Sequence, residues 1–387
     1  MAKKRAKTPS RRGPLKWFFG LILAVTGIAP VSGYEWVIDA YHWLSEHRPV
    51  SANPGEPETA AGNNQTGTIR IYFSTPDLPP GKSEIAAACV AYIDQTKSTL
   101  DVAAFELDNK VITEALVRAV NRGVRVRVAT ETNYLQASGI HALKAVGVTV
   151  IDDQRDGALM HDKFMVFDNK AVWTGSMNFT ENCAYKNNNN GIFIESRELA
   201  ENYTTKFGWM FELHKFGGAP SRAYKIPHPT VTLSDGTVIE NYFSTHDHIA
   251  EHVITETNKA RQVIHFLAFS FTHDGIGKSM LGRAKAGVEV QGVFEKTQAA
   301  GGHTEYEKFR AAGQPVQVYL DANPRNMHHK VIVVDGQTTV AGSFNFSESA
   351  DKSNDENVVI IRSPSVAKLF EEEFQRVYGA AKARDGR

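Results

Sequence analysis

Two stretches of the sequence carry the same polar residues at the same spacing, and residues of these types can act on phosphorus. The first stretch contains His161, Lys163, Asp168, Ser176 and Asn178. The second contains His328, Lys330, Asp335, Ser343 and Asn345. Each copy reads H-x-K, four residues, D, six residues, G-S-x-N, so the intervals are identical. A single site built from two equivalent half-sites is the simplest explanation.

Histidine and lysine together suit phosphoryl transfer. A neutral imidazole can attack phosphorus and form a covalent intermediate, while a second, protonated imidazole donates a proton to the leaving oxygen. Lysine ammonium groups neutralise the non-bridging oxygens, and asparagine amides and serine hydroxyls add further donors. Such a site requires no metal, and the sequence shows no Asp/Glu cluster or Cys/His spacing typical of a metal site. We therefore expect neither a metal nor another cofactor.

The doubled pattern resembles the signature of the phospholipase D superfamily, HxKxxxxD followed by GSxN. The resemblance covers the chain from about Ile69 onward and implies two α/β halves packed face to face, with one histidine from each meeting in a central cleft. It also implies a phosphohistidine intermediate. The implied catalytic residues are His161, Lys163, Asp168, His328, Lys330 and Asp335, with Ser176, Asn178, Ser343 and Asn345 binding the substrate. A single H-x-K could also be a strand segment with a surface lysine, but two matched copies disfavour that alternative.

Composition places few limits on the partner. The 387 residues suffice for two core-forming units, and 42% hydrophobic and 22% charged residues indicate a globular chain. Lys+Arg and Asp+Glu both number 43, which gives no argument for nucleic acid and none against a local basic groove. Cys89 and Cys183 form no disulfide framework. Cys89 lies in an apolar stretch typical of a core, although a single Cys89–Cys183 bridge stays open if the protein is exported.

The N-terminal region is typical of a membrane segment. The first sixteen residues carry seven Lys or Arg and no acid, and residues 17–34 are uncharged. Eighteen helical residues span roughly 27 Å, just short of a ~30 Å hydrocarbon core. Trp17, Tyr34 and Trp36 lie at its ends, as interfacial aromatic residues do. We expect a retained anchor with the catalytic part on the extracytoplasmic side. A cleaved signal peptide near Ser32-Gly33, and secretion, is the alternative.

The second half of the sequence repeats the first beyond the motif. Ile69–Asp77 returns as Ile239–Asp247, and apolar runs then alternate with helical patterns in both halves. This alternation predicts an α/β fold of two pseudo-symmetric halves, each a mostly parallel sheet flanked by helices, with the active site at their interface. We expect a basic N-terminus and membrane segment at 1–47, a flexible linker at 48–68, the first half at 69–214, an inter-half linker at 215–238 and the second half at 239–387.

Within each motif, the histidine and lysine are two residues apart at the start of a strand, so they share a face. Asp168 and Asp335 end that strand at a turn, where an ordinary turn carboxylate is as good an interpretation as a catalytic one. The glycine before each motif serine allows the backbone to come close to a phosphate. His329 points to the opposite face from His328, which favours a supporting role.

The halves differ 28 residues after each motif histidine, where the first half has Asn189 and the second has Glu356. The resemblance implies that a glutamate here hydrogen-bonds the catalytic histidine, so we expect Glu356 to contact His328 and Asn189 to contact His161. A carboxylate favours imidazolium and an amide does not. The hypothesis is that His328 is the protonated acid and His161 the neutral nucleophile. The reverse assignment stays open, because acid and base roles exchange in the second step.

The expected reaction is phosphodiester hydrolysis, and the substrate is open. The halves resemble the small nuclease and cardiolipin-hydrolase branch, and the membrane segment favours a phospholipid. A tether also suits a membrane-bound or exported endonuclease that cleaves DNA or RNA. A basic cluster could follow a nucleic-acid backbone, or it could simply be a solvated face; it consists of Arg118, Arg122, Arg125 and Arg127. An inactive binding module is disfavoured because both motifs keep histidine and lysine. No oligomer is required, since both half-sites are in one chain.

Overall fold

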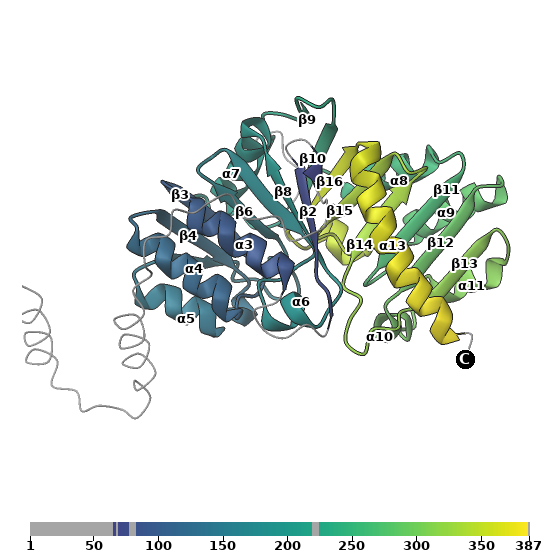
Figure 1. Cartoon of the computed structure of the whole chain (residues 1–387), viewed down its shortest axis with the longest axis horizontal. Helices are drawn as coiled ribbons and strands as arrows, with labels where there is room; N and C mark the ends of the chain where they lie inside the picture. Colours follow the sequence, from purple (N-terminus) through teal and green to yellow (C-terminus); the bar gives the residue numbers. More distant parts are fainter. Residues whose placement is uncertain (1–64, 67–68, 77–82, 219–223, 386–387) are drawn as a thin grey trace, which may run out of the picture. The chain divides into compact units, whose positions relative to one another are not determined.

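The computed structural model describes residues 65–66, 69–76, 83–218 and 224–385. The predicted N-terminal region at 1–47, with its membrane segment, and most of the predicted linker at 48–68 lie outside these ranges. No helix within the described ranges is both long enough and apolar enough to cross a membrane. The described chain forms two eight-stranded sheets, one from each half of the sequence (Figure 1).

The first sheet has the order β1-β2-β8-β7-β6-β3-β4-β5. Its strands are β1 (Gln65–Thr66), β2 (Ile69–Phe73), β3 (Thr99–Ala104), β4 (Arg125–Thr130), β5 (Thr149–Asp152), β6 (Lys163–Phe167), β7 (Ala171–Gly175) and β8 (Asn190–Glu195). Strand β4 pairs in parallel with β3 and with β5, and the other neighbours are antiparallel.

The second sheet repeats this arrangement, with the order β13-β12-β11-β14-β15-β16-β10-β9. Its strands are β9 (Thr230–Thr232), β10 (Val238–Ser244), β11 (Val263–Ala268), β12 (Glu289–Phe294), β13 (Val316–Leu320), β14 (Lys330–Val334), β15 (Thr338–Gly342) and β16 (Glu356–Arg362). Here β12 pairs in parallel with β11 and β13, and the remaining pairs are antiparallel. Strand β9 lies inside the segment 215–238 that the sequence predicted as a linker.

The prediction of mostly parallel sheets is wrong, because both sheets are mixed and mostly antiparallel. The motif strands β6 and β14 are buried at every position, so they read as continuous apolar runs, a pattern typical of parallel strands. Their actual connections are tight turns to β7 and β15, and a tight turn can join only antiparallel neighbours.

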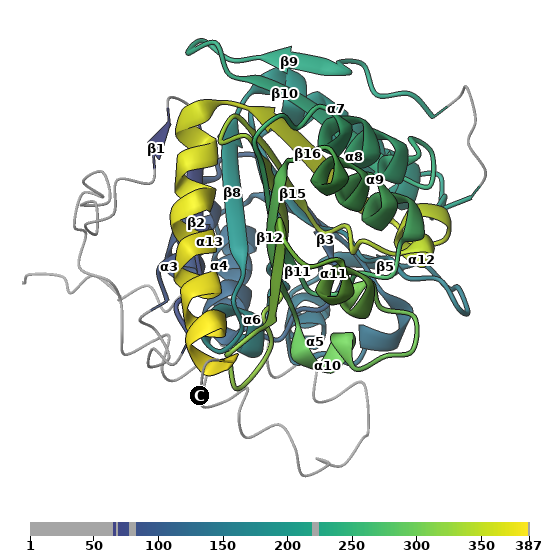
Figure 2. The same ribbon diagram turned by 90° about the vertical axis from the view of Figure 1, so that its right-hand side faces the viewer.

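Helices cover the outer faces of both sheets and fill the space between them. The first half contributes α3 (Glu84–Gln95), α4 (Lys110–Asn121), the 3₁₀ helix η1 (Thr132–Tyr134), α5 (Ser138–Ala145), α6 (Glu181–Tyr185) and α7 (Arg197–Phe211). The second contributes α8 (Ile249–Asn258), α9 (Asp274–Lys285), α10 (Lys296–Ala299), α11 (Tyr306–Ala312), α12 (Glu348–Lys352) and α13 (Pro364–Asp385). Figure 2 shows the second sheet between α13 on one side and α8 and α9 on the other.

One central hydrophobic core joins the halves. It contains residues from one face of each sheet together with α7 and α13, such as Phe164, Phe207, Val333 and Phe374. Two further clusters lie on the outer faces, beneath α3–α5 in the first half and beneath α8, α9 and α11 in the second. Because both motif strands border the shared core, the packing of that core sets how the two motifs meet.

Candidate active site

Each motif lysine is the first residue of a central strand, and its histidine lies two residues earlier. Strand β6 begins at Lys163 and β14 at Lys330. Both strands lie well inside their sheets, between β3 and β7 and between β11 and β15. Both histidines are buried, with 6% of each residue exposed. The imidazoles are therefore held by the most constrained part of each sheet.

Backbone hydrogen bonds run between the two motifs and the opposite halves. The N–H of His161 donates to the carbonyl of Asp355 at 2.9 Å, and the N–H of His328 donates to the carbonyl of Asn188 at 2.9 Å. Each motif thus pairs with the residues that lead into β16 or β8 of the other sheet. This pairing decides which side chains reach each imidazole.

The partner of each imidazole comes from the opposite half. Both carboxylate oxygens of Glu356 lie 2.8 Å from Nδ1 of His161. Oδ1 of Asn189 lies 2.9 Å from Nδ1 of His328. The prediction that Glu356 contacts His328 and Asn189 contacts His161 is therefore wrong, because packing between the halves exchanges the partners. In both pairs a protonated Nδ1 can donate to the oxygen, which leaves Nε2 available to a substrate.

The motif lysines are buried beside the histidines. Nζ of Lys163 donates to the carbonyl of His161 at 2.5 Å, and Nζ of Lys330 donates to the carbonyl of His328 at 2.8 Å. Among the described residues, neither lysine has a carboxylate within ion-pair distance. Burial lowers the pKa of Lys163 to about 8 and lowers that of Lys330 well below its ordinary value. An anion bound between these ammonium groups would offset the cost of burying them.

Two phenylalanines complete the symmetry of the site. The ring centroid of Phe105 lies 4.7 Å from the ring of His161, and that of Phe269 lies 4.5 Å from the ring of His328. The same rings lie 4.7 Å and 4.5 Å from Nζ of the neighbouring motif lysines. The sequence analysis missed both residues, although each directly follows an equivalent strand, β3 or β11.

The charges of both halves act on each imidazole. Burial lowers the pKa of His161 and of His328 well below the ordinary value, and the positive charges of Lys163 and Lys330 lower both further. Burial also raises the pKa of Glu356 well above its ordinary value. The two half-sites are therefore one electrostatic unit, in which an incoming anion stabilises the ammonium and imidazolium forms.

The motif serines hold the residues that face the histidines. Oγ of Ser343 donates to Glu356 at 2.7 Å, and Oγ of Ser176 donates to Oδ1 of Asn189 at 3.1 Å. Each hydroxyl also accepts a backbone N–H from the following strand at 3.0 Å. Since its hydrogen is directed to the partner residue, neither hydroxyl donates to a substrate in this arrangement. Both serines position Glu356 and Asn189.

The glycine and asparagine of each G-S-x-N segment lie at corresponding places in the two halves. Gly175 has φ +137° and Gly342 has φ +156°, and a Cβ at either would collide with the backbone carbonyl at the start of the next strand. Only glycine therefore allows β7 and β15 to approach their neighbours so closely. Asn178 and Asn345 each carry a buried Oδ1 atom with no hydrogen-bond partner among the described residues.

Asp168 and Asp335 lie at the far ends of the motif strands from the histidines. Asp168 accepts the backbone N–H groups of residues 97–99 at 2.7 to 3.0 Å, and Asp335 accepts those of residues 261–263 at 2.8 to 2.9 Å. At about 3.3 Å per residue, a five-residue strand separates them from the lysines by roughly 16 Å. The structure does not bring these carboxylates to the imidazoles, and we interpret them as structural turn carboxylates.

The residue between histidine and lysine also bonds across the interface. Asp162 accepts Nδ2–H of Asn357 at 2.7 Å. In the other motif, Nδ1 of His329 lies 2.9 Å from Nδ2 of Asn190, and its Nε2 lies 2.9 Å from Glu373. His329 thus has the supporting position expected from its place in the strand.

A buried ionic cluster supports the Glu356 side of the site. Asp355 precedes Glu356, and its carboxylate is 2.5 Å from Nζ of Lys206 and 2.6 Å from the guanidinium of Arg155. The side chains of Asp355 and Lys206 are fully buried. The sequence analysis missed this cluster, since 149 and 200 residues separate the partners along the chain.

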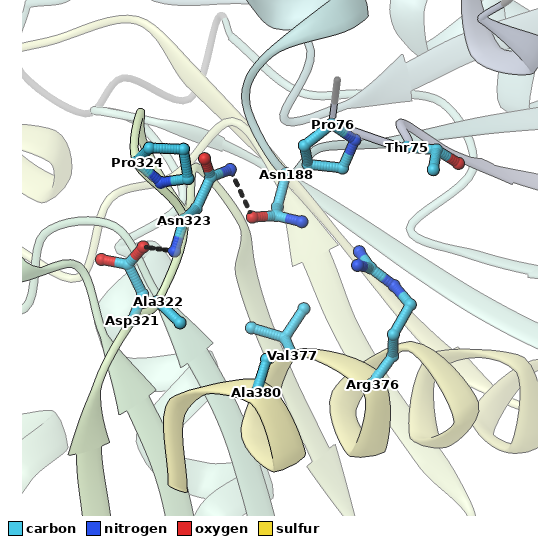
Figure 3. Close-up of a pocket in the computed structure, with 10 residues that line it drawn as sticks. All are labelled: Thr75, Pro76, Asn188, Asp321, Ala322, Asn323, Pro324, Arg376, Val377 and Ala380. Carbon is cyan, nitrogen blue, oxygen red and sulfur yellow. Dashed lines mark hydrogen bonds between the residues drawn. The ribbon is translucent and has the colours of Figure 1, made fainter. Parts of the chain in front are cut away.

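On the Asn189 side, the residue that corresponds to Asp355 is the neutral Asn188, and a cavity of about 250 Å³ lies beside it. Figure 3 shows Asn188 and Asn323, which are hydrogen-bonded at 2.7 Å, with Arg376 of α13 on the opposite side. The cavity is lined by Thr75, Pro76, Asn188, Asp321, Ala322, Asn323, Pro324, Arg376, Val377 and Ala380. Neither motif histidine lines this cavity.

Two remaining expectations concern cysteines and metals. Cys89 and Cys183 are both free and buried, so the disulfide left open by the sequence is not formed in this structure. In the described part of the chain, no three His, Cys, Asp or Glu side chains are grouped so as to hold a metal ion.

Comparison with known proteins matches the doubled architecture. The family model "Cardiolipin synthase, PLD-like domain" matches residues 89–211 and again residues 253–378. A phospholipase D from Rickettsia felis is 34% identical over 146 residues, which are 36% of this chain and 70% of that protein. A mitochondrial cardiolipin hydrolase from Chlamydomonas reinhardtii is 30% identical over 119 residues, 31% of this chain and 52% of that protein. The chain thus spans about half the length of the second relative.

A solved structure shares the fold of both halves. Phosphatidylserine synthase from Haemophilus influenzae Rd KW20 aligns with 80% of this chain and 85% of its own, with a TM-score of 0.61 and 14% identity. The two family matches each contain one complete motif, and together they cover more than half of the sequence. This protein therefore belongs to the phospholipase D superfamily.

Proposed function

We propose that this protein is a phospholipase D-type phosphodiesterase that hydrolyses the head-group ester of a phospholipid through a phosphohistidine on His161, without a metal. The observation that carries the proposal is the crossed arrangement of two imidazoles, each backed by a hydrogen-bond acceptor from the other half. Such a site has two nitrogen atoms with different partners and two buried cations for one phosphate.

His161 is the nucleophile in this proposal. Glu356 accepts Nδ1–H and fixes the tautomer in which the Nε2 lone pair is free, as a carboxylate does for a catalytic histidine. Nε2 attacks phosphorus, the N–P bond forms, and the P–O bond to the head group breaks. The imidazole ring becomes cationic in this step, and the carboxylate stabilises it. His161 is also the nucleophile of the sequence-based hypothesis. The physical reason differs, because Glu356 contacts His161 and not His328.

His328 is the general acid. Its partner Asn189 carries no charge, so the imidazolium form is a readier proton donor than it would be beside a carboxylate. The bound phosphodiester anion favours protonation of His328, and Nε2–H is transferred to the leaving alkoxide. Neutral His328 then removes a proton from water, which attacks phosphorus, breaks the N–P bond and releases phosphatidate.

Lys163 and Lys330 supply the positive charge that the non-bridging oxygens require. Both are buried without an ion-pair partner among the described residues, and the phosphate would be that partner. The amides of Asn178 and Asn345 add N–H donors through their Nδ2 groups. Ammonium and amide groups then take the place of a metal ion in stabilising the transition state.

We also propose that the N-terminal segment 17–34 attaches the protein to a membrane, with the catalytic part on the extracytoplasmic side. Its length and flanking basic residues support this attachment. A membrane anchor brings the site close to phospholipid, and the Rickettsia and Chlamydomonas relatives are a phospholipase D and a mitochondrial cardiolipin hydrolase. These two points favour a lipid over a nucleic-acid substrate.

The test compares phosphatidylcholine, cardiolipin and single-stranded DNA as substrates, each with and without a chelator. We expect head-group release from lipid that persists in the chelator and is lost in His161→Ala. His141→Ala, at an exposed histidine outside both motifs, is the matched control and keeps wild-type activity. Loss of activity in the chelator would contradict the metal-free mechanism, and cleavage of DNA alone would replace the lipid substrate.

A further inference from the structure

Each motif lysine has an aromatic ring beside it where a buried cation usually has a carboxylate. Nζ of Lys163 lies over the ring of Phe105, 4.7 Å from its centroid, and Nζ of Lys330 lies over the ring of Phe269 at 4.5 Å. Both distances are within the roughly 6 Å over which the negative face of a ring attracts a cation. Because the same contact recurs in both halves, accidental packing is a poor explanation for it.

The backbone fixes both rings beside the motifs. Phe105 directly follows β3, and its N–H donates to the carbonyl of Asp162 at 3.0 Å. Phe269 directly follows β11, and its N–H donates to the carbonyl of His329 at 2.8 Å. In each half the acceptor is the residue between the motif histidine and the motif lysine. The position of each ring is therefore tied to the motif that it serves.

The absence of a carboxylate distinguishes these lysines from an arginine in a similar contact. Arg127 lies over the ring of Phe207 but also pairs with Asp101 at 2.7 Å. Among the described residues, Nζ of Lys163 and of Lys330 each contact a ring and a backbone carbonyl, with no carboxylate within ion-pair distance. A carboxylate would cancel the charge of the lysine and repel a phosphate. A ring carries no net charge, so it stabilises the cation and leaves its charge for an incoming anion.

Burial makes such stabilisation necessary. It lowers the pKa of Lys163 to about 8 and that of Lys330 well below its ordinary value, and the charge of Lys163 lowers the pKa of Lys330 further. Both lysines also act on His161 and His328. The ionisable groups that oppose the loss of the lysine protons are Glu356 and Cys183 for both lysines, with Asp162 and Glu106 for Lys163. A ring face adds to them, since it favours the ammonium form.

We propose that Phe105 and Phe269 are positioning residues, which hold the two motif lysines in place and in the ammonium form that binds the substrate phosphate. The same rings contact the imidazoles of their motifs, at centroid distances of 4.7 Å and 4.5 Å. Each ring thus joins the lysine and the histidine of one half. The inference rests on the proposed phosphodiester hydrolysis, and it explains how two buried cations are kept without ion pairs.

Fluorinated phenylalanines test the rings in the full-length chain. Each fluorine withdraws electron density from the ring face, which weakens cation binding and leaves the size of the ring nearly unchanged. Sulfate is the probe for calorimetric titration, because it is not turned over and keeps its double negative charge across the pH range used. The measured quantity is the Kd for sulfate at one alkaline and one acidic pH.

The expected effect depends on pH, because the ring acts on the protonation of the lysine. At about pH 9, above the pKa of Lys163, each fluorine at Phe105 or Phe269 should raise the Kd about twofold, and three fluorines should raise it about tenfold. At about pH 6, where Lys163 is protonated with or without the fluorines, the Phe105 variants should bind sulfate like the wild type.

Four further variants separate the ring from its surroundings. Trifluorinated phenylalanine at Phe309 is the matched control and keeps the wild-type Kd, because this buried ring contacts other aromatic rings and no cation lies over it among the described residues. Phe105→Tyr retains the ring and should bind like the wild type, whereas Phe105→Leu should bind about tenfold more weakly at the alkaline pH. Lys163→Met should lose most of the affinity, which verifies where sulfate binds.

Three outcomes would overturn the inference: an unchanged Kd in all ring variants at the alkaline pH, an equal loss at both pH values in the Phe105 variants, or no sulfate binding by the wild type. The first would mean that the rings only fill space, and the second that fluorine disturbs the packing. Failure of the proposed function looks different. A stepwise response of sulfate binding in a wild type that hydrolyses no phosphodiester would refute the hydrolysis and leave the role of the rings intact.

Discussion

Glu356 lies with both carboxylate oxygens 2.8 Å from Nδ1 of His161, although the two residues belong to opposite halves of the chain. Neither half can assemble this pair alone. The pair forms because the N–H of His161 bonds to the carbonyl of Asp355, the residue before Glu356. Catalysis and the packing of the halves are thus linked through one backbone hydrogen bond.

Glu356→Gln tests this pair. An amide cannot balance the charge that develops on His161 when Nε2 attacks phosphorus, so we expect kcat to fall about 10²- to 10⁴-fold. Head-group release under saturating substrate measures the change, with thermal unfolding to verify that the variant folds. Glu198→Gln, at an exposed glutamate of α7, is the matched control and keeps wild-type kcat. Retention of kcat within about threefold in Glu356→Gln would refute the role of the carboxylate.

Asn189→Asp tests the role of His328. A carboxylate at 2.9 Å from Nδ1 would stabilise imidazolium and raise the pKa of His328. If His328 acts as the acid, activity requires its protonated form, and the alkaline limb of the kcat profile moves to higher pH. A profile of kcat against pH for wild type and variant measures this shift. Movement of the acidic limb instead would show that His328 enters the reaction as a base.

Asp168→Asn tests the interpretation of the motif aspartates as turn carboxylates. Although burial raises the pKa of Asp168, hydrogen bonds from the N–H groups of Thr99, Lys97 and Ser98 outweigh it and lower the pKa below its ordinary value. A lowered folded-state pKa stabilises the fold above the unfolded-state value near ~3.9, and this stability is lost as pH falls through the folded-state pKa.

The variant should therefore be less stable than wild type at pH 7 by about 1 kcal/mol, with a smaller difference below about pH 3. Urea unfolding at the two pH values measures both quantities. Its kcat should stay within about twofold of wild type. A loss of kcat as large as that of His161→Ala would show that Asp168 has a catalytic role.

The positions of the histidines and lysines could be predicted because they depend on local order. A lysine two residues after a histidine at the start of a strand shares its face in any sheet, and the repeated spacing reveals two equivalent half-sites. Strand direction could not be predicted in the same way. The residues of β6 are buried on both faces, so their apolar run contains no signal that separates parallel from antiparallel neighbours.

The partners of the imidazoles depend on packing between the halves, which sequence spacing does not encode. Glu356 and His328 are in one half, and a distance of 28 residues fits a contact within that half as well as one across the interface. The buried pair of Lys206 and Asp355 was missed for the same reason. The hydrophobic face of α7 predicts a buried helix, but it does not predict a buried ammonium group on that helix.

Lys206→Met tests how far that buried ion pair supports the site. Nζ of Lys206 lies 2.5 Å from Asp355, both side chains are fully buried, and Asp355 fixes the backbone that presents Glu356 to His161. Removing the ammonium group leaves the carboxylate with the guanidinium of Arg155 and the N–H of Gly217, and we expect the free energy of unfolding to fall by about 3 kcal/mol. Denaturant unfolding measures the loss, and kcat of the folded fraction should also fall.

Two comparisons make this test specific to the pair. Lys215→Met, at an exposed lysine shortly after α7, should change stability by no more than about 0.5 kcal/mol. Lys206→Met combined with Asp355→Asn removes both charges, and its loss should be smaller than the sum of the two single losses, because no unpaired charge remains buried. Additive losses would mean that Lys206 and Asp355 act independently, and that Glu356 is held by the backbone ladder alone.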